Sequence, residues 1–223
     1  MRPLCAGVVI ALLALSPSGV RANGDPGVGP PTVYERFVLS ACSPCIRESY
    51  PITSLAVPPQ TLPGSARAAA GAAVRSGEIA IEVLRAQQLG RPDWNSLALR
   101  VTLSVMPSPG GEMYRLGIGL LDGTDVRPLA QAVSEMTKIA TAPLANSTAE
   151  IVDVDFHGGT LRIGVFRIRG DTLGYVQAGD LPTLLQRPVW EVPTTLYLSV
   201  EGLSTLAVAL AQAAATIERV RGN

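Results

Sequence analysis

Strict alternation of apolar and polar residues is the feature that most limits how this chain can fold. Residues 97–105 carry leucine or valine at every odd position, with a small or polar residue between them. Shorter alternating runs occupy 79–83 and 114–120. Because neighbouring side chains of a strand point to opposite faces, the pattern predicts strands with one buried face, as in an antiparallel meander. Turn-forming residues at 90–93 and 107–111 separate these strands.

An amphipathic helix follows each set of predicted strands. The first helix has Thr124 or Asp125 as its N-cap and ends at Pro143. Its apolar stripe consists of Leu129, Ala132, Val133, Met136, Ile139 and Ala140. The second helix spans 204–220 with Ser204 as the N-cap. The strands predicted before it are 150–156, 160–168, 172–177 and 195–200.

The same order of elements therefore occurs twice, which predicts an α+β fold of antiparallel sheets and two amphipathic helices. We interpret 77–223 as one α+β domain built from two half-repeats, 77–142 and 149–221. A Pro/Gly-rich N-terminal arm, 23–76, precedes it and contains one β-like run at 33–40. Its prolines exclude a long helix and a central strand.

The stretch 150–168 predicts a hairpin with Gly158 and Gly159 in the turn, which sets His157 opposite Thr160. The pairs on the core face are then Phe156 with Leu161, Val154 with Ile163, and Val152 with Val165. Those on the outer face are Asp155 with Arg162, Asp153 with Gly164, and Ile151 with Phe166.

The outer face of this hairpin is polar near the turn and apolar further along. A second turn at residues 170–171 brings Tyr175 beside Phe166 and Leu173 beside Ile168. The candidate binding face consists of Ile151, Phe166, Ile168, Leu173 and Tyr175. These side chains need a cover, which is a helix, the N-terminal arm or a partner.

The polar part of this face contains a weak candidate metal site. Asp153, Asp155 and His157 occur at every second position, so all three project from one side of a strand. Carboxylates and imidazole are metal ligands. An ion pair of Asp155 with Arg162 at a solvated strand end explains the same residues more simply, and we predict no metal.

Residues 1–22 predict an export signal. Arg2 precedes an apolar run at 4–15, and Val20-Arg21-Ala22 has the form of a signal peptidase site. The run is shorter than the roughly 20 residues that span a bilayer. We therefore expect a secreted or periplasmic protein with no membrane span after cleavage.

Cys42 and Cys45 are the cysteines that remain after the signal is removed, and we expect an oxidising compartment to join them in a disulfide. The segment Cys42-Ser43-Pro44-Cys45 resembles the active-site Cys-x-Pro-Cys of the thioredoxin family. Residues 181–185, around Pro182, look like the segment of that family's cis-proline. The resemblance implies a thiol–disulfide oxidoreductase; the alternative is a structural disulfide that pins the arm.

Charge and motifs exclude several function classes. The chain has 18 basic and 18 acidic residues, without the basic excess of a nucleic-acid binder. It lacks a Gly-x-Ser-x-Gly motif, a phosphate-binding glycine loop and a second histidine. We therefore predict an exported, non-enzymatic binding or assembly protein without a cofactor, whose partner is a protein or an apolar small ligand. The alternative is an oxidoreductase that uses Cys42 and Cys45.

Overall fold

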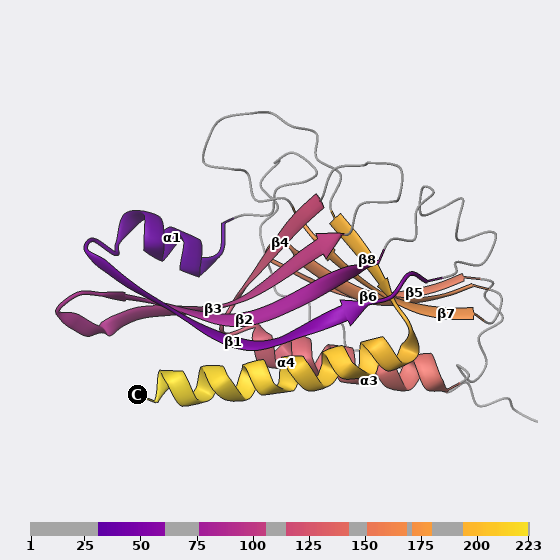
Figure 1. Ribbon diagram of the computed structural model, residues 1–223. Coiled ribbons are helices and arrows are strands. Elements are labelled where there is room, and N and C mark those ends of the chain that lie inside the picture. Colours follow the sequence, from indigo (N-terminus) through magenta and orange to yellow (C-terminus); the bar gives the residue numbers. More distant parts are fainter. Residues whose placement is uncertain are drawn as a thin grey trace, which may run out of the picture.

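The computed structural model describes residues 31–60, 76–105, 115–142, 151–168, 171–179 and 194–222. Within these stretches the chain forms two four-stranded antiparallel sheets and three helices (Figure 1). This architecture confirms the α+β class. The signal predicted at 1–22 lies outside the described residues.

The first sheet contains four strands in chain order, each antiparallel to the next. They are β1 (Cys45–Val57), β2 (Gly77–Gln88), β3 (Arg91–Val105) and β4 (Arg115–Asp122). The odd-numbered apolar residues of β2 and β3 are buried, as the alternation predicted. β1 is the end strand, and its register shifts between Pro51 and Thr53. An end strand with a bulge tolerates proline, which has no N–H to donate.

The second sheet repeats this arrangement and lies directly against β4. Its strands are β5 (Ile151–Gly158), β6 (Leu161–Ile168), β7 (Asp171–Ala178) and β8 (Thr194–Leu198). The amide of Leu120 on β4 donates to Oγ1 of Thr160 at 2.9 Å. A Cβ on Gly119 would lie 2.8 Å from Cδ1 of Leu161. Glycine at this position therefore permits the close approach of the two sheets.

The two long helices lie together beneath the sheets (Figure 1). α3 (Val126–Thr141) follows the first sheet but packs against β5 and β6 of the second. α4 (Val200–Arg221) follows the second sheet and packs against β1 and β2 of the first, as well as against β7. The helix of the first half thus covers the second sheet, and the helix of the second half contacts both sheets. The order of strands followed by one helix occurs twice, as predicted, but the first set has one strand more than predicted, because β1 lies within the stretch 23–76 that was expected to form an extended arm.

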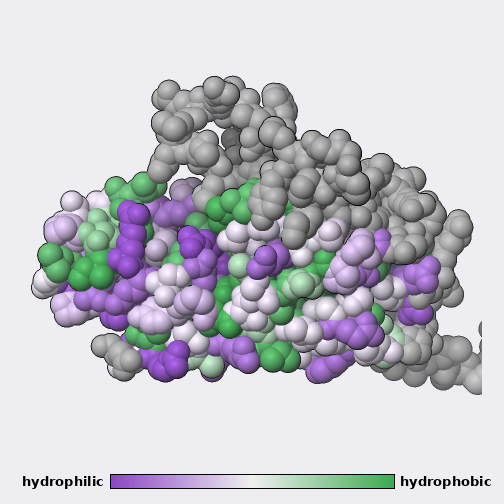
Figure 2. Space-filling view, in the orientation of Figure 1, coloured by the Kyte–Doolittle hydropathy of each residue, from purple (hydrophilic) through white to green (hydrophobic). Residues whose placement is uncertain are grey.

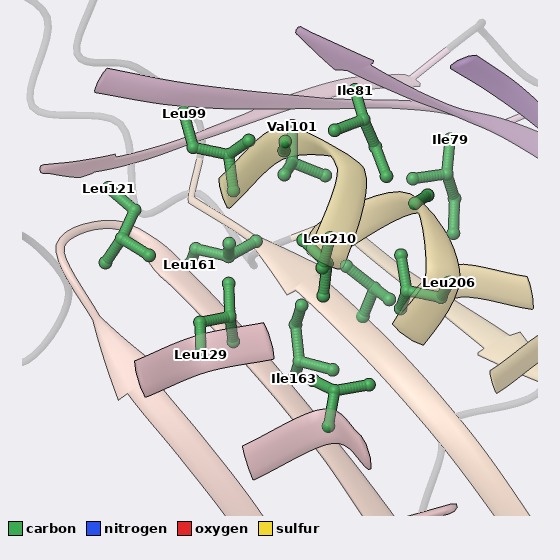
Figure 3. Close-up of a cluster of buried hydrophobic side chains, with 14 of the residues drawn as sticks. Ile79, Ile81, Leu99, Val101, Leu121, Leu129, Leu161, Ile163, Leu206 and Leu210 are labelled. Atoms are coloured by element: carbon green, nitrogen blue, oxygen red, sulfur yellow. The ribbon is translucent and has the colours of Figure 1, made fainter. Parts of the chain in front are cut away.

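One continuous core joins the sheets and the two helices (Figure 3). Leu129 of α3 lies beside Leu161 and Ile163 of β6, whereas Leu206 and Leu210 of α4 lie against the first sheet. These five side chains are at most 1% exposed. Burial of each stabilises the fold by roughly 1.5–3 kcal/mol relative to an exposed position.

The run 33–40 is a helix, so the prediction of a β-like run there was wrong. Oγ1 of Thr32 accepts a hydrogen bond from the amide of Glu35 at 3.1 Å, and the Glu35 carboxylate accepts from the amide of Thr32 at 2.7 Å. This reciprocal capping box starts α1 (Val33–Ser40). The helix packs Tyr34 and Phe37 on the outer face of the first sheet. The residues that it covers there include Leu84, Ala86, Ala98 and Leu120.

The β5–β6 hairpin differs from the predicted register by two residues. His157 lies opposite Arg162 and Gly158 opposite Leu161, so the turn is at residues 159–160 rather than 158–159. Gly159 has a φ of +55°, which glycine adopts readily. Because the shift is two residues, every side chain keeps its predicted face. The β6–β7 pairing shifts in the same way, with Phe166 opposite Leu173.

Two element boundaries also differ from the predictions. α4 begins at Val200, because Oγ of Ser199 accepts from the amide of Gly202 at 3.1 Å. Ser204, the predicted N-cap, lies in the first turns and its hydroxyl donates to the carbonyl of Val200. The β2–β3 turn is at residues 89–90, and residues 91–93 belong to β3. α3 has Asp125 as its N-cap, as predicted.

Candidate functional site

The outer face of the second sheet carries most of the residues predicted as a binding face. The ring centroid of Phe166 lies 6.2 Å from that of Tyr175 and 5.9 Å from that of Tyr197. Ile168 and Leu173 form a small cluster with Phe166 and Tyr197. The described helices pack elsewhere: α3 and α4 are part of the core between the sheets, and α1 lies on the first sheet.

Only part of this face is accessible. Ile168, Leu173 and Tyr175 are each 8% exposed, whereas Phe166 and Tyr197 are half-buried. The side chain of Ile151 lies outside what the structure describes. Sequence reasoning missed Tyr197. It lies in the strand predicted at 195–200, and alternation along that strand places it on the same face as Thr195, which was a usable signal.

The polar half of the face is a paired network around Arg162. Its Nε donates to Oδ2 of Asp155 at 2.6 Å, and its Nη2 lies 3.5 Å from Oδ2 of Asp153. The hydroxyl of Tyr175 donates to Oδ1 of Asp153 at 3.2 Å. The predicted pair of Asp155 with Arg162 is therefore present, although Arg162 lies diagonally across from Asp155 and directly opposite His157.

Tyr175 links the polar and apolar halves of this face. Its ring lies across Gly164, where an added Cβ would come within 2.5 Å of the ring and the hydroxyl. The guanidinium of Arg162 lies 5.5 Å from the ring centroid on the same side of the sheet. Burial raises the pKa of the Tyr175 hydroxyl, and the charge of Asp153 raises it further. The group therefore stays a neutral hydrogen-bond donor at ordinary pH.

The three residues of the weak metal candidate do not form a ligand cluster. Asp153 and Asp155 both direct carboxylate oxygens at Arg162, and the His157 side chain is exposed beyond them. Among the described residues, no group of three histidine, cysteine or carboxylate side chains is arranged to hold a metal ion. A cation at this position would compete with the arginine for the same oxygens.

Cys42 and Cys45 form a disulfide at the junction between α1 and β1. Cys42 is buried, and its amide donates to the carbonyl of Phe37 at 3.0 Å in the last turn of α1. The carbonyl of Pro44, inside the disulfide loop, accepts from the amide of Leu89 at 3.0 Å. The disulfide loop therefore connects the end of α1 to the tip of the β2–β3 hairpin.

This position differs from the thioredoxin arrangement in one decisive respect. In that family the reactive thiol lies at a helix N-terminus, where the positive end of the helix dipole stabilises a thiolate. Cys42 follows the C-terminal end of α1, where unpaired carbonyls disfavour a negative charge. Pro182, the other part of the resemblance, lies outside the described residues.

One described helix, α4, is long and apolar enough to cross a membrane, with a mean hydropathy of 1.4. Its buried side includes Leu203, Leu206, Leu210 and Ile217, which pack in the core. Packing of this kind is typical of the core helix of a globular domain.

The fold and these features define a class: an α+β domain of two antiparallel sheets that share one layer of two helices. It has an aromatic outer sheet face and a disulfide at a helix end. No protein-family model and no curated protein sequence matches the chain.

Proposed function

We propose that this chain is an exported, non-enzymatic binding or assembly protein that holds its partner on the outer face of the second sheet. The observation that carries the proposal is the group of Phe166, Tyr175 and Tyr197, over which none of the described helices packs. Aromatic residues beside a polar rim are typical of the centre of a binding surface. The partner is a protein or an apolar small ligand.

The chemistry of the face also supports binding over catalysis. The carboxylates of Asp153 and Asp155 are engaged by Arg162, and the Tyr175 hydroxyl is a proton donor whose pKa is raised. A general base needs a group that loses its proton near the working pH. In this proposal Phe166 and Tyr197 contact the partner, and Ile168 and Leu173 form the floor beneath them.

A matched pair of variants tests the proposal. Phe166→Ala removes an aromatic ring from the outer face, and Phe156→Ala removes one from the inner face that packs on the core. We expect Phe166→Ala to weaken self-association in sedimentation or the binding of anilinonaphthalene sulfonate, with little change in thermal stability. Phe156→Ala should lower stability by about 3 kcal/mol. A large stability loss in Phe166→Ala with association and dye binding unchanged would remove this face from the proposal.

The exported location is a separate part of the proposal and has its own test. The segment 1–22 has the composition of a cleaved signal, so protein recovered from its native host should begin at Asn23. N-terminal sequencing of the exported fraction measures this directly. Recovery of an intact Met1 in that fraction would contradict cleavage.

The second candidate function is a thiol–disulfide oxidoreductase. It rests on the Cys42–Cys45 disulfide and on the exposed neighbours Ser43 and Pro44. The disulfide's place after the C-terminal end of α1 argues against a low-pKa thiol. Insulin reduction distinguishes the two functions.

A further inference from the structure

Four exposed apolar side chains lie at the end of the molecule that carries α1, three of them on or beside the α1 face and Ile46 on the opposite face of the first sheet. They are Leu39, Leu89, Trp94 and Ile46, with 65%, 58%, 43% and 39% of their surface exposed. We call these four residues the apolar tip. Figure 2 shows apolar residues at this end, and in Figure 1 the β2–β3 hairpin extends past the C-terminal end of α4. The tip is therefore a projecting surface rather than a flat one.

Several contacts hold the tip in one arrangement. The rings of Phe37 on α1 and Trp94 on β3 meet edge to face, with their centroids 6.5 Å apart. The amide of Leu89 donates to the carbonyl of Pro44 at 3.0 Å. The Cys42–Cys45 disulfide closes the loop between α1 and β1. The exposed residues therefore come from three separate segments that are fixed to one another, so little ordering is needed when the tip binds a surface.

The tip is positively charged, although the whole chain is neutral. The charged residues within 36–47 and 87–95 are Arg36, Arg47, Arg91 and Asp93, all of them exposed. The guanidinium of Arg91 lies 4.2 Å from the ring centroid of Trp94. The carboxylates that flank these segments are engaged: Glu35 accepts from Thr32 in the capping box of α1, and Glu48 lies 3.6 Å from Arg85. Within the segments, three arginines against one aspartate leave a charge of +2. This charge is complementary to an anionic partner.

We propose that the apolar tip docks on an anionic lipid membrane. Tryptophan is favoured at the level of the headgroups, where its ring is apolar and its N–H remains hydrated. Arginine side chains reach from such a site to lipid phosphates, and the negative surface potential attracts them. Leu39 and Leu89 enter the boundary of the acyl chains, while Arg36, Arg47 and Arg91 contact the headgroups. A projecting tip suits insertion between lipids better than a flat protein interface of about 800 Å² per partner.

This surface is separate from the outer face of the second sheet, and the proposal does not rest on the proposed function. Figure 1 places α1 and the β2–β3 hairpin at one end of the molecule and β5 and β7 at the other. A membrane-docked tip therefore leaves the second sheet free to hold a partner.

Cosedimentation with lipid vesicles tests the proposal on the full-length chain. We expect binding to vesicles of phosphatidylcholine and phosphatidylglycerol in equal parts, weaker binding to pure phosphatidylcholine, and a loss of binding as salt increases. Leu89→Asp should weaken binding by roughly tenfold or more, because it places an anion in the inserted surface. The matched control is Val208→Asp on α4, a residue 60% exposed on a different surface, which should bind as the unmodified chain does.

Two further measurements separate insertion from simple charge attraction. Trp94 fluorescence should shift to shorter wavelength on the anionic vesicles, and the shift should disappear in Trp94→Phe although Trp190 remains. Arg91→Gln should weaken binding to the anionic vesicles and leave binding to phosphatidylcholine unchanged. Thermal melts establish that the variants fold.

Three outcomes would overturn the proposal. The first is the absence of cosedimentation with anionic vesicles. The second is equal binding by Leu89→Asp and Val208→Asp. The third is a concentration-dependent dimer that Leu89→Asp abolishes while vesicle binding is unaffected, which would assign the tip to contacts between copies of the protein.

Discussion

Asp122, the last residue of β4, holds the start of α1 through the backbone of Tyr34. Its Oδ1 accepts a hydrogen bond from the Tyr34 amide at 3.1 Å, and its Oδ2 accepts from the Val33 amide at 3.0 Å. The first amides of a helix have no partner within the helix, and they form its positive end. A carboxylate that is distant in the sequence thus fixes the helix on the first sheet.

We predict that Asp122→Ala lowers the free energy of unfolding by about 1–2 kcal/mol, because it leaves two helix amides without their acceptor. Asp125→Ala is the matched control, since Asp125 precedes α3 and its side chain makes no capping hydrogen bond. Urea denaturation of both variants measures the difference. Equal losses in the two variants would show that the contact of Asp122 with α1 does not stabilise the fold.

A second prediction concerns Gly164 and Tyr175, which lie opposite each other on the outer face of the second sheet. An added methyl group would come within 2.5 Å of the tyrosine ring. Gly164→Ala should therefore displace the ring and cost about 1–3 kcal/mol of stability. In a Tyr175→Ala background the same substitution should cost much less, because the obstructing ring is gone. Denaturant unfolding of the four proteins in this cycle measures the coupling, and additive effects would contradict the arrangement.

Strands β2 to β8 were predicted from the sequence because alternation is a local property, whereas β1 was not predicted. The buried face of β3 follows directly from the spacing of Leu99, Val101 and Leu103 at every second position. The register of the β5–β6 hairpin, by contrast, depends on contacts with a strand that is distant in the sequence. Backbone and side-chain hydrogen bonds between Leu120 and Thr160 place the turn at residues 159–160, and β4 is about forty residues away in the sequence. The adjacent glycines at 158 and 159 gave no means of choosing the correct turn.

Two other features show what sequence reasoning used and what it missed. The helix at 33–40 was mistaken for a strand because Val33, Phe37 and Val38 favour strands. Thr32 and Glu35 form a capping box that is visible in the sequence and was overlooked. The apolar tip, by contrast, forms because the fold places Leu39 and Trp94 at the same end of the molecule. No local sequence pattern predicts that placement.

A third prediction concerns stability at alkaline pH. Burial, followed by the charge of Asp153, raises the pKa of Tyr175 above its ordinary value of 10.0. Above pH 10 the unfolded chain therefore releases this proton while the folded protein retains it. The contribution of Tyr175 is fully present below pH 10, and it is lost as the pH rises toward the folded pKa.

The free energy of unfolding should therefore fall as the pH rises above 10, and it should fall less steeply in Tyr175→Phe. The pKa values of Tyr34 and Tyr197 are also raised by burial, so a smaller decline remains in the variant. Urea denaturation at a series of alkaline pH values measures the slope, and tyrosinate absorbance reports the ionisation. Identical slopes in the two proteins would contradict a buried Tyr175 hydroxyl.

The last prediction concerns the disulfide, where the binding protein and the oxidoreductase differ most. The Cys42–Cys45 loop contains only four residues, so the bond removes little entropy from the unfolded chain. The double variant Cys42→Ser and Cys45→Ser should lose about 2 kcal/mol of stability or less. Purified native protein should show no free thiol under denaturing conditions.

The same double variant tests for redox activity. Because Cys42 follows the C-terminal end of α1, the reduced thiol should not have a pKa below the ordinary cysteine value of about 8.5. We therefore expect the native protein and the double variant to be equally inactive in insulin reduction. Alkylation rates of reduced Cys42 across a pH series measure the thiol directly. Catalysed insulin reduction that disappears in Cys42→Ser, together with rapid alkylation near neutral pH, would establish the oxidoreductase in place of the binding protein.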